Sequence, residues 1–295
     1  MDVLRALGWR IEIERALDGS ASGAGVYRVR ANGRDAVLKV GVGRRELDFY
    51  LTLAERVPVA TPKLLRYGEV DEFTALLLSA HTPAAPAGEW KRADWLEVTR
   101  QLAALHSAAV PEGEAWRHES WLLQALEEPP VGLAEDYWSR TEAGSRLGAV
   151  FEDSAALAAA YSKPPDCFVH GDCHVDNLLR EGDQFVWADW QAATVGSPAG
   201  DLAFLWSRAD ADGADLPYDE MLHEYAVLRS VDSAVLRRAV LAAELGILLY
   251  GWPNYARHRS RADQARMTRR LLRLMDDWLL GGPVEGAAGG WGERS

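Results

Sequence analysis

The sequence predicts an α+β fold with two lobes, a small β-rich N-lobe and a larger, mostly helical C-lobe. The chain has 295 residues, enough for two domains of ordinary size. Short β-rich runs dominate its first eighty residues, and helical periodicity dominates the rest. We therefore expect an N-lobe over residues 1–80, a C-lobe over 81–282 and a flexible Gly-rich tail over 283–295.

The composition is that of a globular protein and narrows the range of partners. Hydrophobic residues make up 48% and charged residues 26% of the chain. Forty-four acidic against 32 basic residues give a formal net charge of −12, which argues against nucleic acid and anionic membranes as partners. The same charge favours a small cationic acceptor, although simple solubility explains it equally well.

The sequence also predicts a cytoplasmic location. It opens without a basic segment followed by an apolar one, and no apolar stretch approaches the ~20 residues needed to cross a bilayer. Cys167 and Cys173 are too few for a disulfide framework, so we expect both to be reduced packing residues. The oligomeric state is left open.

In the N-lobe, two β-rich runs over 26–29 and 36–40 are joined by the turn sequence Ala31-Asn32-Gly33-Arg34 and predict a hairpin. A loop of small residues precedes it over 18–25. A helix is expected over 44–56 and is stopped by Pro58. A buried strand is expected over 73–78. The next residues, Ser79 to Pro83, are expected to form a hinge between the lobes.

In the C-lobe, Asp94 is expected to cap a helix that ends near Pro111, and the segments over 112–166 and 218–280 are expected to be mostly helical. Four tryptophans are expected to be core or interface aromatics rather than substrate platforms, namely Trp95, Trp116, Trp121 and Trp138. Glu244 has two interpretations. It either receives an amine-bearing substrate or is a satisfied carboxylate in a packed helix, and we favour the second. The basic run over 257–270 is expected to be a solvated helix face.

The most informative stretch runs from Phe168 to Leu179, with the sequence FVHGDCHVDNLL, and is followed by FVWADW over 185–190. The turn sequence between the two segments predicts a hairpin. Such a hairpin brings Asn177 and Asp189 together at one end, with Asp172 on the loop just before it. Carboxylate and amide oxygens converging in this way suit Mg²⁺, and phosphoryl transfer needs both a metal ion and a carboxylate that orients the attacking hydroxyl.

These motifs resemble those of the aminoglycoside phosphotransferase and choline kinase-like family, which includes viomycin and capreomycin phosphotransferases. The family signature HGDxHxxN, a hairpin and an aspartate correspond here to HGDCHVDN and ADW. The resemblance implies a protein-kinase-like two-lobed fold, ATP and Mg²⁺ as cofactors, Asp172 as the catalytic base or hydroxyl-orienting residue, and Asn177 and Asp189 as metal ligands. It also implies a structural role for His170.

The resemblance extends to the N-lobe. Lys39 stands where the family has the strand lysine that grips the ATP phosphates, and Glu46 on the next helix is its expected partner. The expected cofactor-binding residues are completed by the loop and the hinge, with Gly19, Ser20, Ser22, Gly23, Gly25, Ser79 and Ala80. Later in the chain, GSPAGDLA over 196–203 resembles the family's GDPAYDLA, which implies that Asp201 stabilises the loop.

The function that follows is ATP- and Mg²⁺-dependent O-phosphorylation of a small cationic natural product. The resemblance suggests an antibiotic, either an aminoglycoside or a cyclic peptide of the viomycin and capreomycin type. Two alternatives stay open: a metabolic kinase acting on choline, homoserine or an amino sugar, and a nucleotide-binding regulatory module without turnover. No long activation segment separates Asp189 from Asp201, which argues against a protein substrate.

Overall fold

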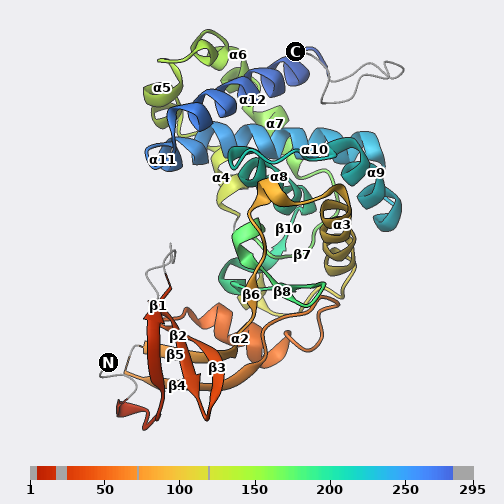
Figure 1. The fold of residues 1–295 in the computed structure, drawn as a ribbon. Coiled ribbons are helices and arrows are strands. Elements are labelled where there is room, and N and C mark those ends of the chain that lie inside the picture. Colours follow the sequence, from red (N-terminus) through yellow and green to blue (C-terminus); the bar gives the residue numbers. More distant parts are fainter. Residues whose placement is uncertain (1–4, 18–24, 72, 119, 282–295) are drawn as a thin grey trace. The chain divides into compact units, whose positions relative to one another are not determined.

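The computed structural model describes residues 5–17, 25–71, 73–118 and 120–281 (Figure 1). Contacts divide the chain into two compact units. We call them the sheet unit, which comprises residues 1–84 and 176–193, and the helical unit, which comprises residues 85–175 and 194–295. The expected α+β composition is confirmed, with a small antiparallel sheet early in the chain and helices through most of the remainder.

The described part of the sheet unit contains a five-stranded antiparallel sheet in the order β1-β2-β3-β5-β4, the helix α2 and a three-stranded sheet in the order β6-β8-β9. Its elements are β1 (Glu12–Ala16), β2 (Gly25–Ala31), β3 (Arg34–Val40), α2 (Arg44–Thr52), β4 (Leu64–Val70), β5 (Phe73–Ser79), β6 (Thr82–Pro83), β8 (Leu178–Glu181), β9 (Gln184–Trp187) and a 3₁₀ turn, Trp190–Ala192.

The predicted hairpin between β2 and β3 is confirmed. Ala31 pairs with Arg34, so the connection has only two residues. Asn32 and Gly33 occupy them with φ values of 51° and 75°, the left-handed backbone that a tight hairpin turn of this kind requires. This turn fixes the register of β3 and therefore decides which of its side chains face each side of the sheet.

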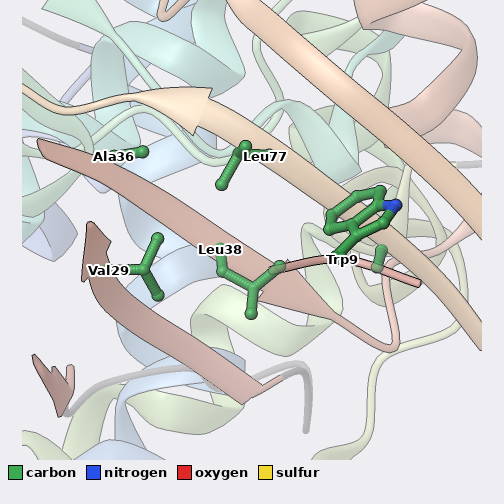
Figure 2. Close-up of a cluster of buried hydrophobic side chains, with 6 residues drawn as sticks. Trp9, Val29, Ala36, Leu38 and Leu77 are labelled. Carbon is green, nitrogen blue, oxygen red and sulfur yellow. The ribbon is translucent and has the colours of Figure 1, made fainter. Parts of the chain in front are cut away.

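Alternate residues of β3 point to opposite faces of the sheet. Ala36 and Leu38 lie in a buried cluster with Trp9, Val29, Ala75 and Leu77, most of which Figure 2 labels. Lys39, between Leu38 and Val40, points to the other face, because successive side chains of a strand alternate. The apolar cluster thus anchors the strand that carries the lysine.

The helical unit is formed mainly by helices, with one small antiparallel sheet of β7 and β10. Its longer elements are α3 (Arg92–His106), α4 (Trp121–Glu127), α5 (Val131–Trp138), α6 (Leu147–Glu152), α7 (Ser154–Tyr161), β7 (Cys167–Val169), β10 (Thr194–Gly196), α8 (Pro198–Ala211), α9 (Tyr218–Arg229), α10 (Ser233–Gly246), α11 (Trp252–Ala256) and α12 (Arg261–Leu279). A π-helical turn, Ile247–Gly251, joins α10 to α11. Within the described residues, no helix combines the length and the apolar character that crossing a bilayer would demand.

Several local expectations need correction. Helix α2 ends at Thr52 rather than near residue 56, and α3 starts at Arg92. Asp94 is therefore not the N-cap of α3. It lies in the first turn, where its carboxylate accepts the backbone N–H of Lys91 in a capping box. Of the four tryptophans expected in the core or at an interface, Trp95, Trp116 and Trp138 are buried in the core, whereas Trp121 is 45% exposed.

The basic run over 257–270 is not wholly solvated, because Arg270 is buried. Its guanidinium donates to both oxygens of Glu244 at 2.7 and 2.9 Å, and both side chains are almost inaccessible to solvent. Glu244 is therefore a satisfied carboxylate between packed helices, as favoured above. Both hydrogen bonds come from one guanidinium nitrogen, Nη2, and each is strengthened by the opposite charges of the two groups.

Candidate active site

The sheet unit brings Lys39, Glu46 and Asp189 together. Lys39 Nζ donates to Glu46 Oε1 at 2.6 Å and to Asp189 Oδ1 at 2.9 Å. The lysine comes from β3, the glutamate from α2 and the aspartate from the segment after β9. Asp189 lies 150 residues after Lys39 in the sequence. One ammonium group therefore links three segments of the chain, and two of its hydrogen bonds are to carboxylates.

Burial and charge act in opposite directions on this cluster. Burial acts to lower the pKa of Lys39, but the charges of Glu46 and Asp189 outweigh it and hold the pKa above its usual range. Burial raises the pKa of Glu46, and the lysine offsets only part of that effect. Glu46 is 2% exposed at its side chain, whereas Asp189 is 31% exposed. Asp189 is thus the member of the cluster that remains accessible to a ligand.

Asp189 has an unusual backbone conformation, with φ 64° and ψ 62°. This left-handed region is uncommon for residues other than glycine, and Asp is one of the few that adopt it readily. The neighbouring Trp190 holds the turn in place. Its ring stacks on Phe49 of α2 with centroids 4.1 Å apart, and its indole N–H donates to the carbonyl of Trp187 at 2.8 Å. Packing against α2 therefore stabilises the conformation that directs the Asp189 carboxylate towards Lys39.

The predicted hairpin carrying Asn177 and Asp189 is confirmed. Leu178 pairs with Trp187, and the backbone N–H of Ala188 donates to the carbonyl of Asn177 at 2.9 Å. Asn177 accepts this last hydrogen bond and Asp189 follows its donor, Ala188, so the two residues lie at the same end of β8 and β9. No group of three or more His, Cys, Asp or Glu suited to a metal ion occurs among the described residues. One carboxylate and one amide oxygen nevertheless fit Mg²⁺, which usually keeps several waters and phosphate oxygens as ligands.

The glycine loop is only partly described. Gly19, Ser20, Ser22 and Gly23 lie outside the described residues, so their expected role remains a prediction. Gly25 is the first residue of β2, and a Cβ atom there would lie 2.8 Å from the ring of Tyr27. Only glycine fits this position without movement of the tyrosine.

Ser79 and Ala80 lie where β5 ends. The Ser79 hydroxyl accepts the backbone N–H of Lys63 at 2.8 Å and is also 2.8 Å from Nε2 of His81. Ala80 follows in the short segment that leads to β6. This segment continues into the pairing of β6 with β8, in which Thr82 lies opposite Arg180.

In the helical unit, the loop after β7 carries Asp172. Gly171 has a φ of 79°, a conformation that favours glycine, and turns the chain sharply after His170. The buried ring of His170 accepts the backbone N–H of Asp172 through Nδ1 at 3.3 Å. This contact fits the structural role expected for His170. His174 Nε2 lies 3.6 Å from Asp172 Oδ1, so a second imidazole flanks the carboxylate.

Asp201 stabilises this loop, as expected. From the first turn of α8, its two oxygens accept the backbone N–H groups of His170 and Gly171 at 2.7 and 2.9 Å. His106 Nε2 lies 3.1 Å from the same carboxylate. Burial acts to raise the pKa of Asp201, but these hydrogen bonds and the histidine charge outweigh it, so the pKa lies below its ordinary value.

The sequence did not reveal His106 as part of this network. His106 ends α3, and its Nδ1 lies 2.6 Å from the hydroxyl of Tyr225 on α9. It therefore connects α3, α8 and α9 behind the loop that carries Asp172. The available signal was a single histidine in the last turn of an amphipathic helix, which alone indicates little.

Comparison with known proteins identifies the family. The model of the phosphotransferase enzyme family matches residues 14–239, more than half of the chain. No curated protein matches the sequence.

Solved structures are similar over nearly the whole chain. A microcompartment-associated aminopropanol kinase has a TM-score of 0.67 and 16% identity, over 95% of this chain and 97% of its own. Amicoumacin kinase, solved with AMP-PNP and Ca²⁺, has a TM-score of 0.63 and 13% identity, over 96% and 93%. A thermostable mutant of an aminoglycoside phosphotransferase has a TM-score of 0.61 and 14% identity, over 94% and 98%. At these identities the similarity shows the fold alone.

The family match confirms the class of protein that the motifs predicted. The chain belongs to the phosphotransferase enzyme family and has its protein-kinase-like fold. It is an ATP-dependent phosphotransferase with an alcohol group as acceptor. The family alone does not determine which alcohol it phosphorylates.

Proposed function

We propose that this enzyme transfers the γ-phosphate of Mg·ATP to a hydroxyl of a small cationic natural product. The proposed acceptor is an antibiotic, either an aminoglycoside or a cyclic peptide of the viomycin and capreomycin type, and its phosphorylation gives resistance. The observation that carries the phosphotransfer chemistry is the Lys39–Glu46–Asp189 cluster, with contacts of 2.6 and 2.9 Å. The sequence resemblance supports the antibiotic class.

In the sheet unit, Lys39 binds the α and β phosphates of ATP, and Glu46 holds the ammonium group in position. Asn177 and Asp189 hold Mg²⁺, which neutralises charge on the phosphate oxygens when bound. The glycine loop over 19–25 covers the nucleotide, and the backbone of Ser79 and Ala80 lies against its base. A metal with oxygen ligands is consistent with the amicoumacin kinase complex, which contains Ca²⁺ with AMP-PNP.

In the helical unit, Asp172 orients the acceptor hydroxyl and accepts its proton as the oxygen attacks the γ-phosphorus. The new bond joins the acceptor oxygen to phosphorus, the bond to the β–γ bridging oxygen breaks, and ADP leaves. The Asp201 carboxylate supports this step indirectly, because it fixes the backbone before Asp172 through two hydrogen bonds.

The net charge of −12 supports a cationic acceptor, since an acidic surface raises the local concentration of cations. We propose that residues 1–80 bind the nucleotide and that 81–282 bind the acceptor, with 176–193 packed into the sheet unit. Dependence on ATP and two buried free cysteines support a cytoplasmic location.

The test is ADP release with Mg·ATP across aminoglycosides, viomycin-type peptides, choline, homoserine and amino sugars. Turnover should be selective for one antibiotic class, and Asp172→Ala should lower kcat by about 10²- to 10⁴-fold. Asp166→Ala is the matched control, because Asp166 is an exposed carboxylate just before β7.

Other outcomes are equally informative. Selective turnover of choline, homoserine or an amino sugar would replace the antibiotic proposal with a metabolic kinase. ATP binding without turnover of any acceptor in the panel would contradict the proposed acceptor class.

A further inference from the structure

Hydrogen bonds link Lys63, Ser79 and His81 at the end of β5. The backbone N–H of Lys63 donates to Ser79 Oγ at 2.8 Å, and the backbone N–H of Ser79 donates to the carbonyl of Lys63 at 2.9 Å. Ser79 Oγ is in turn 2.8 Å from His81 Nε2. Since Oγ already accepts from Lys63, its own hydrogen can be donated to the imidazole. This arrangement of hydrogen bonds therefore fits a neutral His81 with its proton on Nδ1.

The segment with these hydrogen bonds connects the five-stranded sheet to the hairpin that carries the proposed metal ligands. Directly after His81, Thr82 and Pro83 form β6, which pairs with Arg180 and Leu179 of β8 (Figure 1). The backbone N–H of Ala84 then donates to the carbonyl of Leu178 at 3.1 Å. Leu178 is next to Asn177. Ser79 and His81 thus help to fix the path of the segment that runs from the residues proposed to contact the base to the hairpin proposed to hold the metal.

We propose that Ser79 and His81 form a clasp that positions the 79–81 backbone for the nucleotide base and thereby sets the affinity for ATP. Both are positioning residues, and the proposal depends on the proposed nucleotide site. The His81 side chain is only 9% exposed, which keeps water from competing for the Ser79 hydroxyl. The clasp acts on the base end of the nucleotide and leaves the Lys39 cluster unchanged.

In this direction, with Ser79 Oγ as the donor, the clasp requires neutral His81. Burial lowers the pKa of His81, and the Lys63 charge lowers it further, while Glu181 raises it. Glu181 Oε2 lies 3.9 Å from Nδ1 but is 71% exposed, so its charge is well screened. The nearby Arg180 guanidinium is engaged over the Phe185 ring and with the carbonyl of Asp183.

Protonation of His81 reverses the hydrogen bond. An imidazolium must donate from Nε2, so Ser79 Oγ then receives two hydrogens and its own hydrogen loses this acceptor. A group with a lowered pKa stays neutral until the pH falls below its ordinary range. The Ser79-to-His81 hydrogen bond should therefore persist at neutral pH and reverse its direction as the pH falls below the ordinary value of 6.5.

The experiment measures Kd by titration calorimetry for two ligands, Mg·ATP and Mg·tripolyphosphate, which carries phosphates without a base. His81→Ala should raise the Kd of ATP about fivefold, the loss expected for one hydrogen bond. Ser79→Ala, which also removes the acceptor of the Lys63 N–H, should raise it at least as much. Both variants should leave the Kd of tripolyphosphate unchanged. His81→Gln, whose amide oxygen can accept from Ser79, should restore most of the ATP affinity. His223→Ala, at an exposed site on α9, is the matched control.

The pH profile is the second measurement. Between pH 7.5 and 5.5, the ratio of the two ligands' Kd values should change more in the wild type than in His81→Gln, in which only the phosphates of the ligands titrate at this site. Unchanged ATP affinity in His81→Ala, or an equal loss for both ligands, would overturn the clasp. Failure of the wild type to bind either ligand would instead overturn the nucleotide site on which the clasp depends. If His81→Ala does not fold, the pH profile of the wild type against His81→Gln decides the matter alone.

Discussion

Replacing Asp201 by asparagine tests how the catalytic loop is held. The carboxylate accepts the N–H groups of His170 and Gly171 at 2.7 and 2.9 Å and contacts His106 at 3.1 Å. An asparagine keeps only one acceptor oxygen, so at least one charge-assisted hydrogen bond is lost. Its NH₂ group then faces one of the buried backbone N–H groups, which is left without its acceptor. Such a bond contributes about 1.5–3 kcal/mol and an unsatisfied buried group costs about 1–3 kcal/mol. We expect a total loss of about 3 kcal/mol.

The assay combines unfolding and turnover. Urea unfolding should show the loss of stability, and thermal unfolding should show a Tm about 6 °C lower, at about 2 °C per kcal/mol for a protein of this size. The loop that carries Asp172 should shift, so kcat should fall by about 10²-fold. The ATP KM should change little, because the proposed ATP-binding residues belong to the sheet unit. Asp215→Asn, an exposed carboxylate of the helical unit, is the control.

The pH dependence gives a further check on Asp201. Its folded pKa is below the ordinary value of 3.8, so its contribution is fully present above that value and is lost as the pH falls through the lower folded pKa. The difference in stability between wild type and Asp201→Asn should be constant from pH 8 to about 5 and should shrink below about pH 4. Wild-type Tm and kcat in Asp201→Asn would refute the loop-holding argument.

Three further predictions concern the packing. Arg270→Met should lower the free energy of unfolding by about 3–5 kcal/mol because it leaves Glu244 charged and buried, and Glu244→Leu in the same chain should recover most of it; urea unfolding of the single and double variants measures this. Burial raises the pKa of both Cys167 and Cys173, so the two thiols stay protonated at pH 8. Neither should react with a thiol reagent at pH 8 until urea unfolds the protein. Fast labelling of the native protein would contradict this prediction. Trp190→Ala should cost about 3–5 kcal/mol in urea unfolding and weaken the effect of Mg²⁺ on ATP binding, because its stacking on α2 holds the turn of Asp189; unchanged binding would contradict the bracing role.

Much of the fold could be predicted because its signals are local. The Asn32-Gly33 turn specifies a two-residue hairpin, and the turn sequence before Gln184 specifies the second one. Strand alternation then places Lys39 opposite the apolar cluster. The proximity of Asn177 and Asp189 followed from the second hairpin alone, since antiparallel pairing fixes which residues share an end.

The remaining features depend on contacts between distant segments. Burial of Arg270 arises from Glu244, 26 residues earlier, so the local run of basic residues predicted a solvated face. His106 and Asp201 are 95 residues apart, and neither shows a sequence pattern that would identify the other. The exposure of Trp121 is likewise set by the position of α4 against its neighbours, which residue type does not specify.

In the proposed mechanism, Asp189, held by Lys39 and the Trp190 stack, binds the metal that accompanies ATP. The most direct measurement is the Kd of ATP with and without Mg²⁺ in the wild type and in Asp189→Ala, with Asp183→Ala, an exposed residue in the turn of the same hairpin, as control. We predict that Mg²⁺ strengthens ATP binding in the wild type and in Asp183→Ala but not in Asp189→Ala. An equal effect of Mg²⁺ in all three proteins would contradict the claim.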